Sequence, residues 1–147
     1  MGNICRSPTA EAVLRKCAEK AGMDKRITVD SAGTGSWHIG KEPDQRACLA
    51  AARRGYDLTA LRARQVSIDD FQRFDLILAM DHDNLARLRA LRPTTGTAET
   101  DLFLRRYRLS EDSVPDPYYG GEEGFEQVLD LIEAGTAQLL NEIRGRQ

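Results

Sequence analysis

The sequence predicts an α/β domain built on a doubly wound parallel sheet with flanking helices. Segments with helical spacing of apolar residues alternate along the chain with short apolar runs, which is the pattern of that class. Residues 74–80 (FDLILAM) form a continuous apolar run, as expected for a strand that helices cover on both faces. The 147 residues contain no repeat, low-complexity tract or linker. We therefore expect residues 1–147 to form a single domain.

The first half of the chain predicts two helices and a strand. Ser7 is a typical N-cap residue and Pro8 favours the first helical position, so a helix is expected to start there and to stop at Gly22. Residues 27–34 (ITVDSAGT) predict a short strand that runs into a glycine-containing loop. Residues 43–54 predict a second helix that ends at Gly55. The apolar residues of the first helix recur at helical spacing: Ala10, Val13, Leu14, Cys17, Ala18 and Ala21.

The second half predicts two strands and two helices. After the strand at 74–80, residues 81–91 predict a helix with acids in its first turn and arginines in its last, which complements the helix dipole. Residues 100–104 (TDLFL) predict an edge strand. Residues 105–124 carry little secondary-structure signal, and loops of this length are usually functional. The final helix presents one apolar face, made by Phe125, Val128, Leu129, Ile132, Leu139, Leu140 and Ile143.

Composition argues against several classes of function. Hydrophobic residues make up 41% and charged residues 30% of the chain, and the formal net charge is −2. This charge gives no reason to expect nucleic acid or an anionic membrane as a partner. No apolar run has the length of a membrane span and no segment resembles a signal peptide, so a cytoplasmic location is expected. The three cysteines and two histidines fit neither a disulfide framework nor a zinc site, so we expect no structural metal site.

The first residues have the features of an anion-binding loop. In parallel sheets, ligands bind where the carboxyl ends of the strands meet loops and helix N-termini, here residues 1–7, 31–44, 80–84 and 105–124. Residues 2–8 (GNICRSP) place consecutive backbone N–H groups in front of a predicted helix, and Arg6 adds a planar, bidentate donor for two phosphate oxygens. The segment predicts a site for a tetrahedral oxyanion, although an ordinary helix cap has a similar pattern.

A second candidate is Asp116, within residues 114–121 (VPDPYYGG). Flanking prolines fix the backbone on both sides of this carboxyl group. A positioned, protonated Asp can donate a proton to a leaving oxygen, and Tyr118 and Tyr119 could line a pocket for an aromatic ring. An Asp in an ordinary turn, with tyrosines that cover the core, is the alternative interpretation.

Together these segments resemble the low molecular weight protein tyrosine phosphatases. The resemblance extends over essentially the whole chain, through residues 2–13 (GNICRSPTAEAV), 30–44 (DSAGT to PD), 63–85 (ARQVSIDDF to HDNL) and 116–121 (DPYYGG). It implies phosphotyrosine hydrolysis through a cysteinyl-phosphate intermediate, on phosphotyrosine-containing proteins and with phosphate or vanadate as inhibitors. The implied reaction needs no metal and no organic cofactor. In that family the signature loop is Cys-x5-Arg, and its first cysteine is the nucleophile.

The resemblance also assigns roles to individual residues. Arg6 matches the loop arginine, Asp116 the general acid and Ser7 the hydroxyl that steadies the thiolate. The expected phosphate-binding residues are Gly2, Asn3, Ile4, Cys5, Arg6 and Ser7. Asn3 and Ser31 match the polar residues that brace the loop, and Trp37, Tyr118 and Tyr119 match the rim of the substrate pocket. The histidine that many relatives carry three residues before the arginine of ARQ is here Leu61.

The nucleophile itself has no counterpart among the 147 residues. Counted back from Arg6, it falls one position before Met1, together with the central strand that carries it in the family. Cys5 flanks the phosphate, Cys17 is expected in the core, and Cys48 fits Cys-x5-Arg only within a predicted helix. We therefore expect the 147-residue chain to be inactive. We also expect it to be unstable or to form its sheet by exchanging a strand with another chain, because each unpaired buried backbone group costs about 1–3 kcal/mol against a total stability of roughly 5–15 kcal/mol.

Several alternatives remain at this stage. The 147-residue chain could be a short form that binds phosphate-like anions without catalysis, or a fragment that folds poorly. Arginine phosphatases have a similar pattern, but they tend to have Thr at the position of Ile4 and to lack the paired tyrosines. Arsenate reductases of the same fold need a further cysteine pair, and DPYYGG is unexpected in them.

Overall fold

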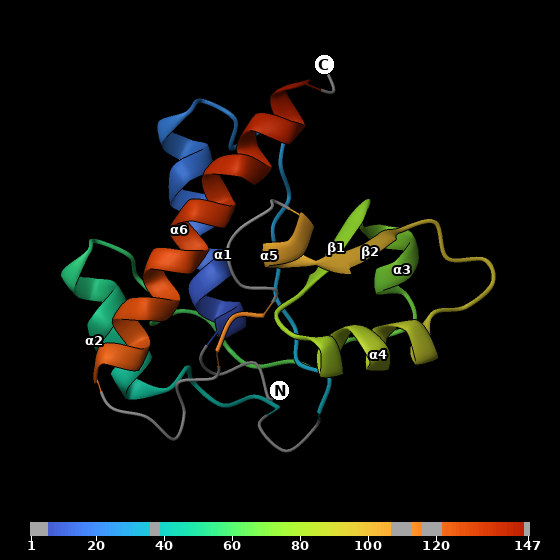
Figure 1. Ribbon diagram of the computed structural model, residues 1–147, viewed down its shortest axis with the longest axis horizontal. Helices are drawn as coiled ribbons and strands as arrows, with labels where there is room; N and C mark the ends of the chain where they lie inside the picture. The colour runs from blue at the N-terminus through green and yellow to red at the C-terminus, as the bar shows by residue number, and fades with distance from the viewer. Residues whose placement is uncertain (1–5, 36–38, 107–112, 116–121, 146–147) are drawn as a thin grey trace.

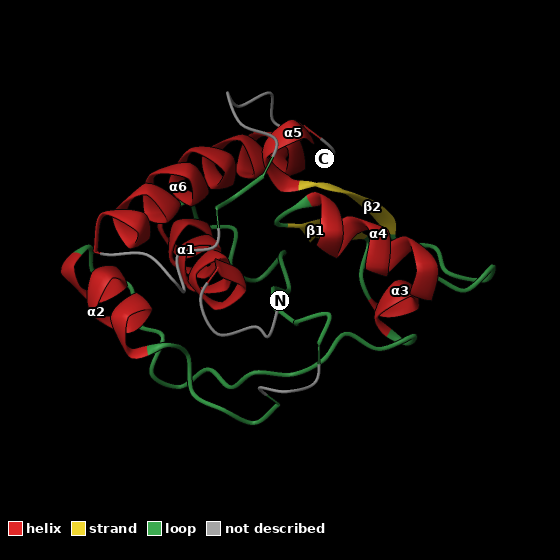
Figure 2. Ribbon diagram, turned by 60° about the horizontal axis from the view of Figure 1, so that its bottom comes forward, coloured by secondary structure: helices red, strands yellow, loops and turns green. Residues whose placement is uncertain are grey.

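The computed structural model describes residues 6–35, 39–106, 113–115 and 122–145. In this part of the chain, β1 (Leu76–Ala79) and β2 (Glu99–Leu102) form a parallel sheet, with Leu76 opposite Glu99 and Ala79 opposite Leu102. The helices are α1 (Arg6–Lys20), α2 (Gln45–Arg53), α3 (Asp70–Arg73), α4 (His82–Leu91), α5 (Phe103–Arg106) and α6 (Glu122–Gly145). Helices α1, α2 and α6 lie together on one side, and α3 and α4 lie beside the sheet (Figures 1 and 2). The predicted α/β class with a parallel sheet and flanking helices is confirmed.

The four long predicted helices are confirmed, and their ends follow from local chemistry. Gly22 has φ +72° and Gly55 has φ +86°, a backbone region that glycine adopts without a steric penalty. At the ends of α1 and α2, the amides of the glycine and of the residue after it donate to carbonyls of the last turn. Met23 N donates to Ala18 O at 2.8 Å, and Tyr56 N donates to Ala51 O at 3.0 Å. The prediction that Ser7 caps the first helix is wrong, because α1 begins at Arg6 and Ser7 lies in its first turn. Sequence patterns locate a helix start only to within one or two residues.

The strands differ more from the prediction. The buried run at 74–80 is β1 and the predicted edge strand is β2, but β2 ends at Leu102, where α5 begins. Residues 27–34 are not a strand: within this segment only Gly33 pairs, through an isolated parallel bridge to Gln65. A cavity separates this segment from β1, so among the described residues the segment has no adjacent strand with which to form a ladder.

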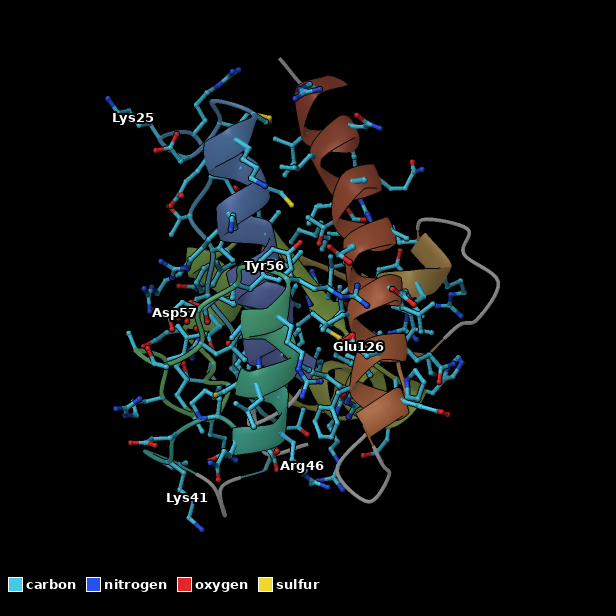
Figure 3. All side chains as sticks on the ribbon, turned by 90° about the vertical axis from the view of Figure 1, so that its left-hand side faces the viewer. Lys25, Lys41, Arg46, Tyr56, Asp57 and Glu126 are labelled. Carbon is cyan, nitrogen blue, oxygen red and sulfur yellow. The ribbon has the colours of Figure 1, made fainter. Side chains whose placement is uncertain are left out.

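The group of α1, α2 and α6 is joined by polar contacts as well as by its apolar core. Arg54, at the end of α2, binds three acids along α6: Glu126 at 3.0 Å, Asp130 at 2.9 Å and Glu133. The Tyr56 hydroxyl donates to Glu133 at 2.6 Å. Figure 3 shows Tyr56 and Glu126 at the two ends of this network. Burial and then the Glu133 carboxylate raise the pKa of Tyr56, so its hydroxyl remains a donor at neutral pH.

Among the helices of the described ranges, none combines the length and apolar character needed to cross a membrane.

Candidate active site

Arg6 is the first described residue of α1, and its guanidinium is buried. Its exposed fraction is 5%. Nη1 donates to Oδ2 of Asp81 and to the carbonyl of Val114, both at 2.8 Å. A buried cation requires such partners, because removal from water disfavours its charge. These contacts fix a planar donor group at the N-terminal end of a helix, where the dipole also favours an anion.

Asp81 follows β1 and connects two features of the site. Its Oδ1 accepts from Asn84 N at 2.8 Å and so caps α4, while its Oδ2 binds Arg6. Burial by itself would raise the pKa of Asp81. The Asn84 amide and the Arg6 guanidinium outweigh burial, and they hold the pKa below its ordinary value. Asp81 is therefore ionised at neutral pH and balances the charge of Arg6.

Val114, in the described segment 113–115, lies beside Arg6 and the end of β1. It is 1% exposed, and its amide donates to the carbonyl of Met80 at 2.7 Å while its own carbonyl accepts from Arg6. The N-terminal end of α1, the end of β1 and the segment 113–115 thus meet at the carboxyl edge of the sheet. This is the edge at which α/β proteins bind their ligands.

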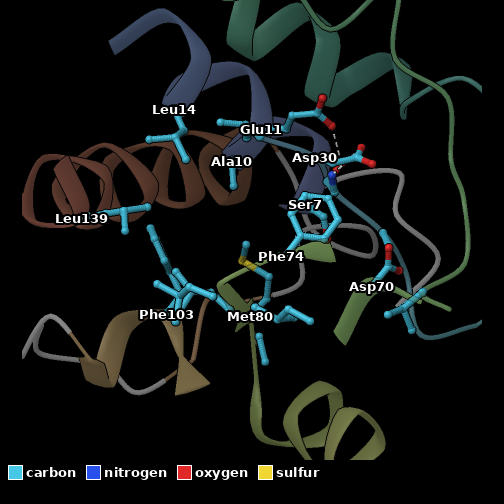
Figure 4. Close-up of a pocket in the computed structure, with 18 of the residues that line it drawn as sticks. Ser7, Ala10, Glu11, Leu14, Asp30, Asp70, Phe74, Met80, Phe103 and Leu139 are labelled. Atoms are coloured by element: carbon cyan, nitrogen blue, oxygen red, sulfur yellow. Dashed lines mark hydrogen bonds between the residues drawn. The ribbon is translucent and has the colours of Figure 1, made fainter. Parts of the chain in front are cut away.

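Ser31 is held against α1 by a buried acid. Its hydroxyl donates to Glu11 Oε1 at 2.6 Å, and Glu11 also binds Arg15 at 2.7 Å. Glu11 is 5% exposed. Ser7, one turn earlier on α1, lines the same cavity as Glu11 (Figure 4), and Ser31 also lines this cavity. Two of the predicted loop-supporting hydroxyls therefore lie near one another.

Of the predicted site residues, the structure describes Arg6, Ser7 and Ser31. The remainder lie outside the described residues: Gly2, Asn3, Ile4, Cys5, Trp37, Asp116, Tyr118 and Tyr119. Sequence reasoning missed the partners Asp81 and Glu11. The position of Asp81 directly after a buried strand was the signal that could have found it, since that is where strands deliver side chains to a site. Glu11 carried no local signal.

The described cysteines are not part of this arrangement. Cys17 and Cys48 are free thiols, and burial raises the pKa of both. Cys48 lies within α2, where its amide donates to Asp44 O at 3.0 Å, so the amides after it are not available for an anion loop. Within residues 6–35, 39–106, 113–115 and 122–145, no cluster of His, Cys, Asp and Glu has an arrangement that could hold a metal ion.

Comparison with known proteins decides the family. The family model described as low molecular weight phosphotyrosine protein phosphatase matches residues 1–147. The chain belongs to this family. A putative low molecular weight protein-tyrosine-phosphatase of Synechocystis is 43% identical over 145 residues, which cover 97% of this chain and 92% of the relative. The predicted resemblance is confirmed, and the protein is a member of an enzyme family of phosphoric monoester hydrolases that act on phosphoproteins.

Solved structures of this phosphatase family agree with the fold. The protein tyrosine phosphatase of Entamoeba histolytica, with Hepes in its active site, has a TM-score of 0.93 and 37% identity, over 100% of this chain and 95% of that one. An arginine phosphatase of Drosophila has a TM-score of 0.87 and 32% identity, over 97% and 93% of the two chains. Each name describes that other protein. Both named activities act on a phosphoryl group, which an anion site at Arg6 could bind.

Proposed function

We propose that this phosphatase hydrolyses phosphotyrosine in proteins through a cysteinyl-phosphate intermediate. One observation carries the proposal: a buried arginine at the start of a helix, held by a carboxylate and a carbonyl at the carboxyl edge of the sheet. In this role Arg6 binds two equatorial oxygens of the phosphate, and the amides of residues 2–6 and the α1 dipole bind the others. Asn3, Ser7 and Ser31 support the loop, and Trp37, Tyr118 and Tyr119 line the pocket for the ring.

The proposed reaction has two displacement steps at phosphorus. A thiolate forms the S–P bond while the P–O bond to the tyrosine breaks, and Asp116 gives its proton to the leaving phenolate. Water then attacks phosphorus, the S–P bond breaks, and the Asp116 carboxylate takes the proton from water. Phosphate leaves and the thiolate is restored. Val114 is two residues before Asp116, and two residues span at most about 7 Å, which supports a position for the acid near Arg6.

The nucleophile in this proposal is a cysteine placed directly before Met1. We propose that the loop binds phosphate or vanadate as inhibitors, and that Cys5 flanks the bound anion and does not attack it.

Two extended proteins test this role. Both carry a short apolar segment before Met1, which ends in cysteine in one and in serine in the other. With p-nitrophenyl phosphate and a phosphotyrosine peptide, we expect turnover only from the cysteine version and vanadate binding by both. Turnover by the 147-residue chain, or by the serine version, would contradict the assignment.

Asp116→Asn tests the acid in the cysteine version. A general acid contributes roughly 10²–10⁴ in rate, and a good leaving group needs it least. We expect Asp116→Asn to lower kcat/KM for the phosphotyrosine peptide by roughly 10²–10⁴-fold and to lower kcat/KM for p-nitrophenyl phosphate much less. Equal slowing of both substrates would remove Asp116 from this role.

Arginine phosphatase activity is a second candidate, because a solved arginine phosphatase shares the fold and 32% identity. Ile4 and the pair Tyr118 and Tyr119 favour an aromatic phosphoester. The comparison of kcat/KM for phosphotyrosine and phosphoarginine peptides decides between the two substrates. We also propose a cytoplasmic location, because the described Cys17 and Cys48 are free thiols, as is usual in a reducing compartment.

A further inference from the structure

Glu11 is a buried carboxylate on the helix that Arg6 opens. It lies about 7.5 Å after Arg6 along the axis of α1, and its exposed fraction is 5%. Its Oε1 accepts from the Ser31 hydroxyl at 2.6 Å, and its Oε2 binds Nη2 of Arg15 at 2.7 Å. Figure 4 shows Glu11 with Ser7 at the wall of the cavity that both residues line. The carboxylate thus lies between the start of α1 and the segment that carries Ser31.

The contact with Glu11 sets the direction of the Ser31 hydroxyl. A carboxylate that is paired with an arginine has acceptor oxygens only, so Ser31 must be the donor in this short bond. A hydroxyl has one proton and two lone pairs. With its proton directed to Glu11, the Ser31 oxygen can only accept hydrogen bonds on its other sides.

A second set of contacts holds the backbone at Ser31. Ser31 N donates to Asp30 Oδ1 at 2.8 Å, and Arg64 Nε donates to Asp30 Oδ2 at 3.0 Å. Arg64 also donates to both carboxylate oxygens of Asp70, at 2.9 and 3.2 Å, and Asp70 is 2% exposed. The backbone of Ser31 is therefore held independently of Glu11, whose contact concerns the hydroxyl alone.

Arg15 holds the Glu11 carboxylate from the outer side of α1. Its Nη2 also donates to the carbonyl of Val29 at 2.7 Å, so one guanidinium group joins the helix to the segment of Ser31. The Arg15 side chain is 54% exposed, so water can hydrate its charge when the carboxylate is removed. Neutralisation of Glu11 therefore leaves no unpaired cation in the core.

We propose that Glu11 is a positioning residue of the anion site, which holds the Ser31 hydroxyl as an acceptor for N–H groups of the phosphate-binding segment. The inference rests on the proposed function, in which Ser31 supports that segment. An anion site at a helix N-terminus consists of N–H donors, and a support that can only accept orders such donors. A hydroxyl turned the other way would offer a proton instead, and the N–H group that it supports would lose its partner.

A double-mutant cycle in vanadate affinity tests this role. The 147-residue chain is compared with Glu11→Gln, Ser31→Ala and the double variant, and both the Kd for vanadate and Tm are measured. Gln has the shape of Glu, but its amide can also donate to Ser31, so it no longer sets the direction of the hydroxyl. Glu133→Gln is the matched control, because Glu133 also accepts from a hydroxyl, that of Tyr56 at 2.6 Å, and binds Arg54.

We expect Glu11→Gln and Ser31→Ala each to weaken vanadate binding by about tenfold, and the double variant to bind no more weakly than Ser31→Ala. Glu133→Gln should lower Tm and leave the Kd within about twofold of the parent value. An unchanged Kd in Glu11→Gln, or effects that multiply in the double variant, would overturn the inference. An equal loss of affinity in Glu133→Gln would also overturn it, because the loss would then follow from stability in general.

The parent chain separates this inference from the function on which it rests. A parent chain that does not bind vanadate would refute the proposed function and the role of Glu11 together. Vanadate binding that Glu11→Gln leaves unchanged would refute the role of Glu11 alone.

Discussion

The pair of Asp81 and Arg6 gives the sharpest test of the site, because one carboxylate caps α4 and also neutralises a buried arginine. Asp81→Asn keeps an oxygen that can accept from Asn84 N, and Asn is as good an N-cap as Asp. It removes the charge next to Arg6, which is only 5% exposed. Breaking a buried ion pair costs about 3–5 kcal/mol. Because the Asp81 side chain is 26% exposed and Val114 O still accepts from Arg6, we expect a smaller loss of about 2–3 kcal/mol.

Asp44 offers a matched control on α2. It caps that helix through Arg46 N at 2.8 Å, and its ion pair is with an arginine whose side chain is 45% exposed. Asp44→Asn should therefore cost less than about 1 kcal/mol. The replacement of either acid by Ala should add about 1 kcal/mol for the lost cap. Urea unfolding at pH 7, with unchanged m-values, measures the free energy of unfolding of each variant.

The pH dependence of the stability difference shows whether Asp81→Asn acts through the lost charge or through a change in side-chain shape. The pKa of Asp81 is lowered in the folded protein, so its stabilisation is fully present above the pKa of an unfolded Asp, about 3.9, and is lost as pH falls through the lower folded value. The difference in stability between the parent chain and Asp81→Asn should therefore close below about pH 4. If Asp81→Asn is as mild as Asp44→Asn at pH 7, the reasoning about the buried pair is wrong.

Two further predictions concern packing and thiols. A Cβ at Gly135 would overlap the ring of Phe103, so Gly135→Ala should lower the free energy of unfolding by about 1–3 kcal/mol, whereas Gly145→Ala, which meets no atom within 4 Å, should leave it unchanged or slightly higher. Restoration of stability in Gly135→Ala by Phe103→Leu would identify the clash as the cause, and no recovery would refute it. Burial raises the pKa of Cys17 and Cys48 above the ordinary value of a thiol, so iodoacetamide should label both slowly at pH 7 and faster as the pH rises, as measured by mass spectrometry. Fast labelling of either thiol at pH 7 would contradict this.

The parts of the fold that the sequence predicted well are those set by local chemistry. Helix α2 ends just before Gly55, and α4 carries an acid in its first turn and an arginine in its last, both as predicted. The strand β1 follows from an apolar run that is too short for a helix of average length. Each of these signals acts within a few residues, so the sequence alone contains it.

What the sequence did not reveal depends on contacts between distant segments. Residues 27–34 have strand-like composition, yet a strand exists only beside a partner, and composition does not show whether the partner is present. The Phe103 ring at the start of α5 lies against Gly135 on α6, a contact across 32 residues that no local signal reveals. The partner of Arg6 is 75 residues away. The sequence thus predicted the arginine and the edge of the sheet on which it lies, but not the carboxylate that holds it.

The cavity beside β1 also determines how the chain should respond to compression. Its volume of about 490 Å³ corresponds to about 300 mL/mol, whereas unfolding under pressure usually releases about 20–100 mL/mol. Because a space of this size opens to solvent, water enters it. Water gains few partners against Leu14, Leu139 and Phe103, so the hydrated form should unfold at modest hydrostatic pressure. The volume change of unfolding under pressure would then measure how much of this space water leaves unfilled.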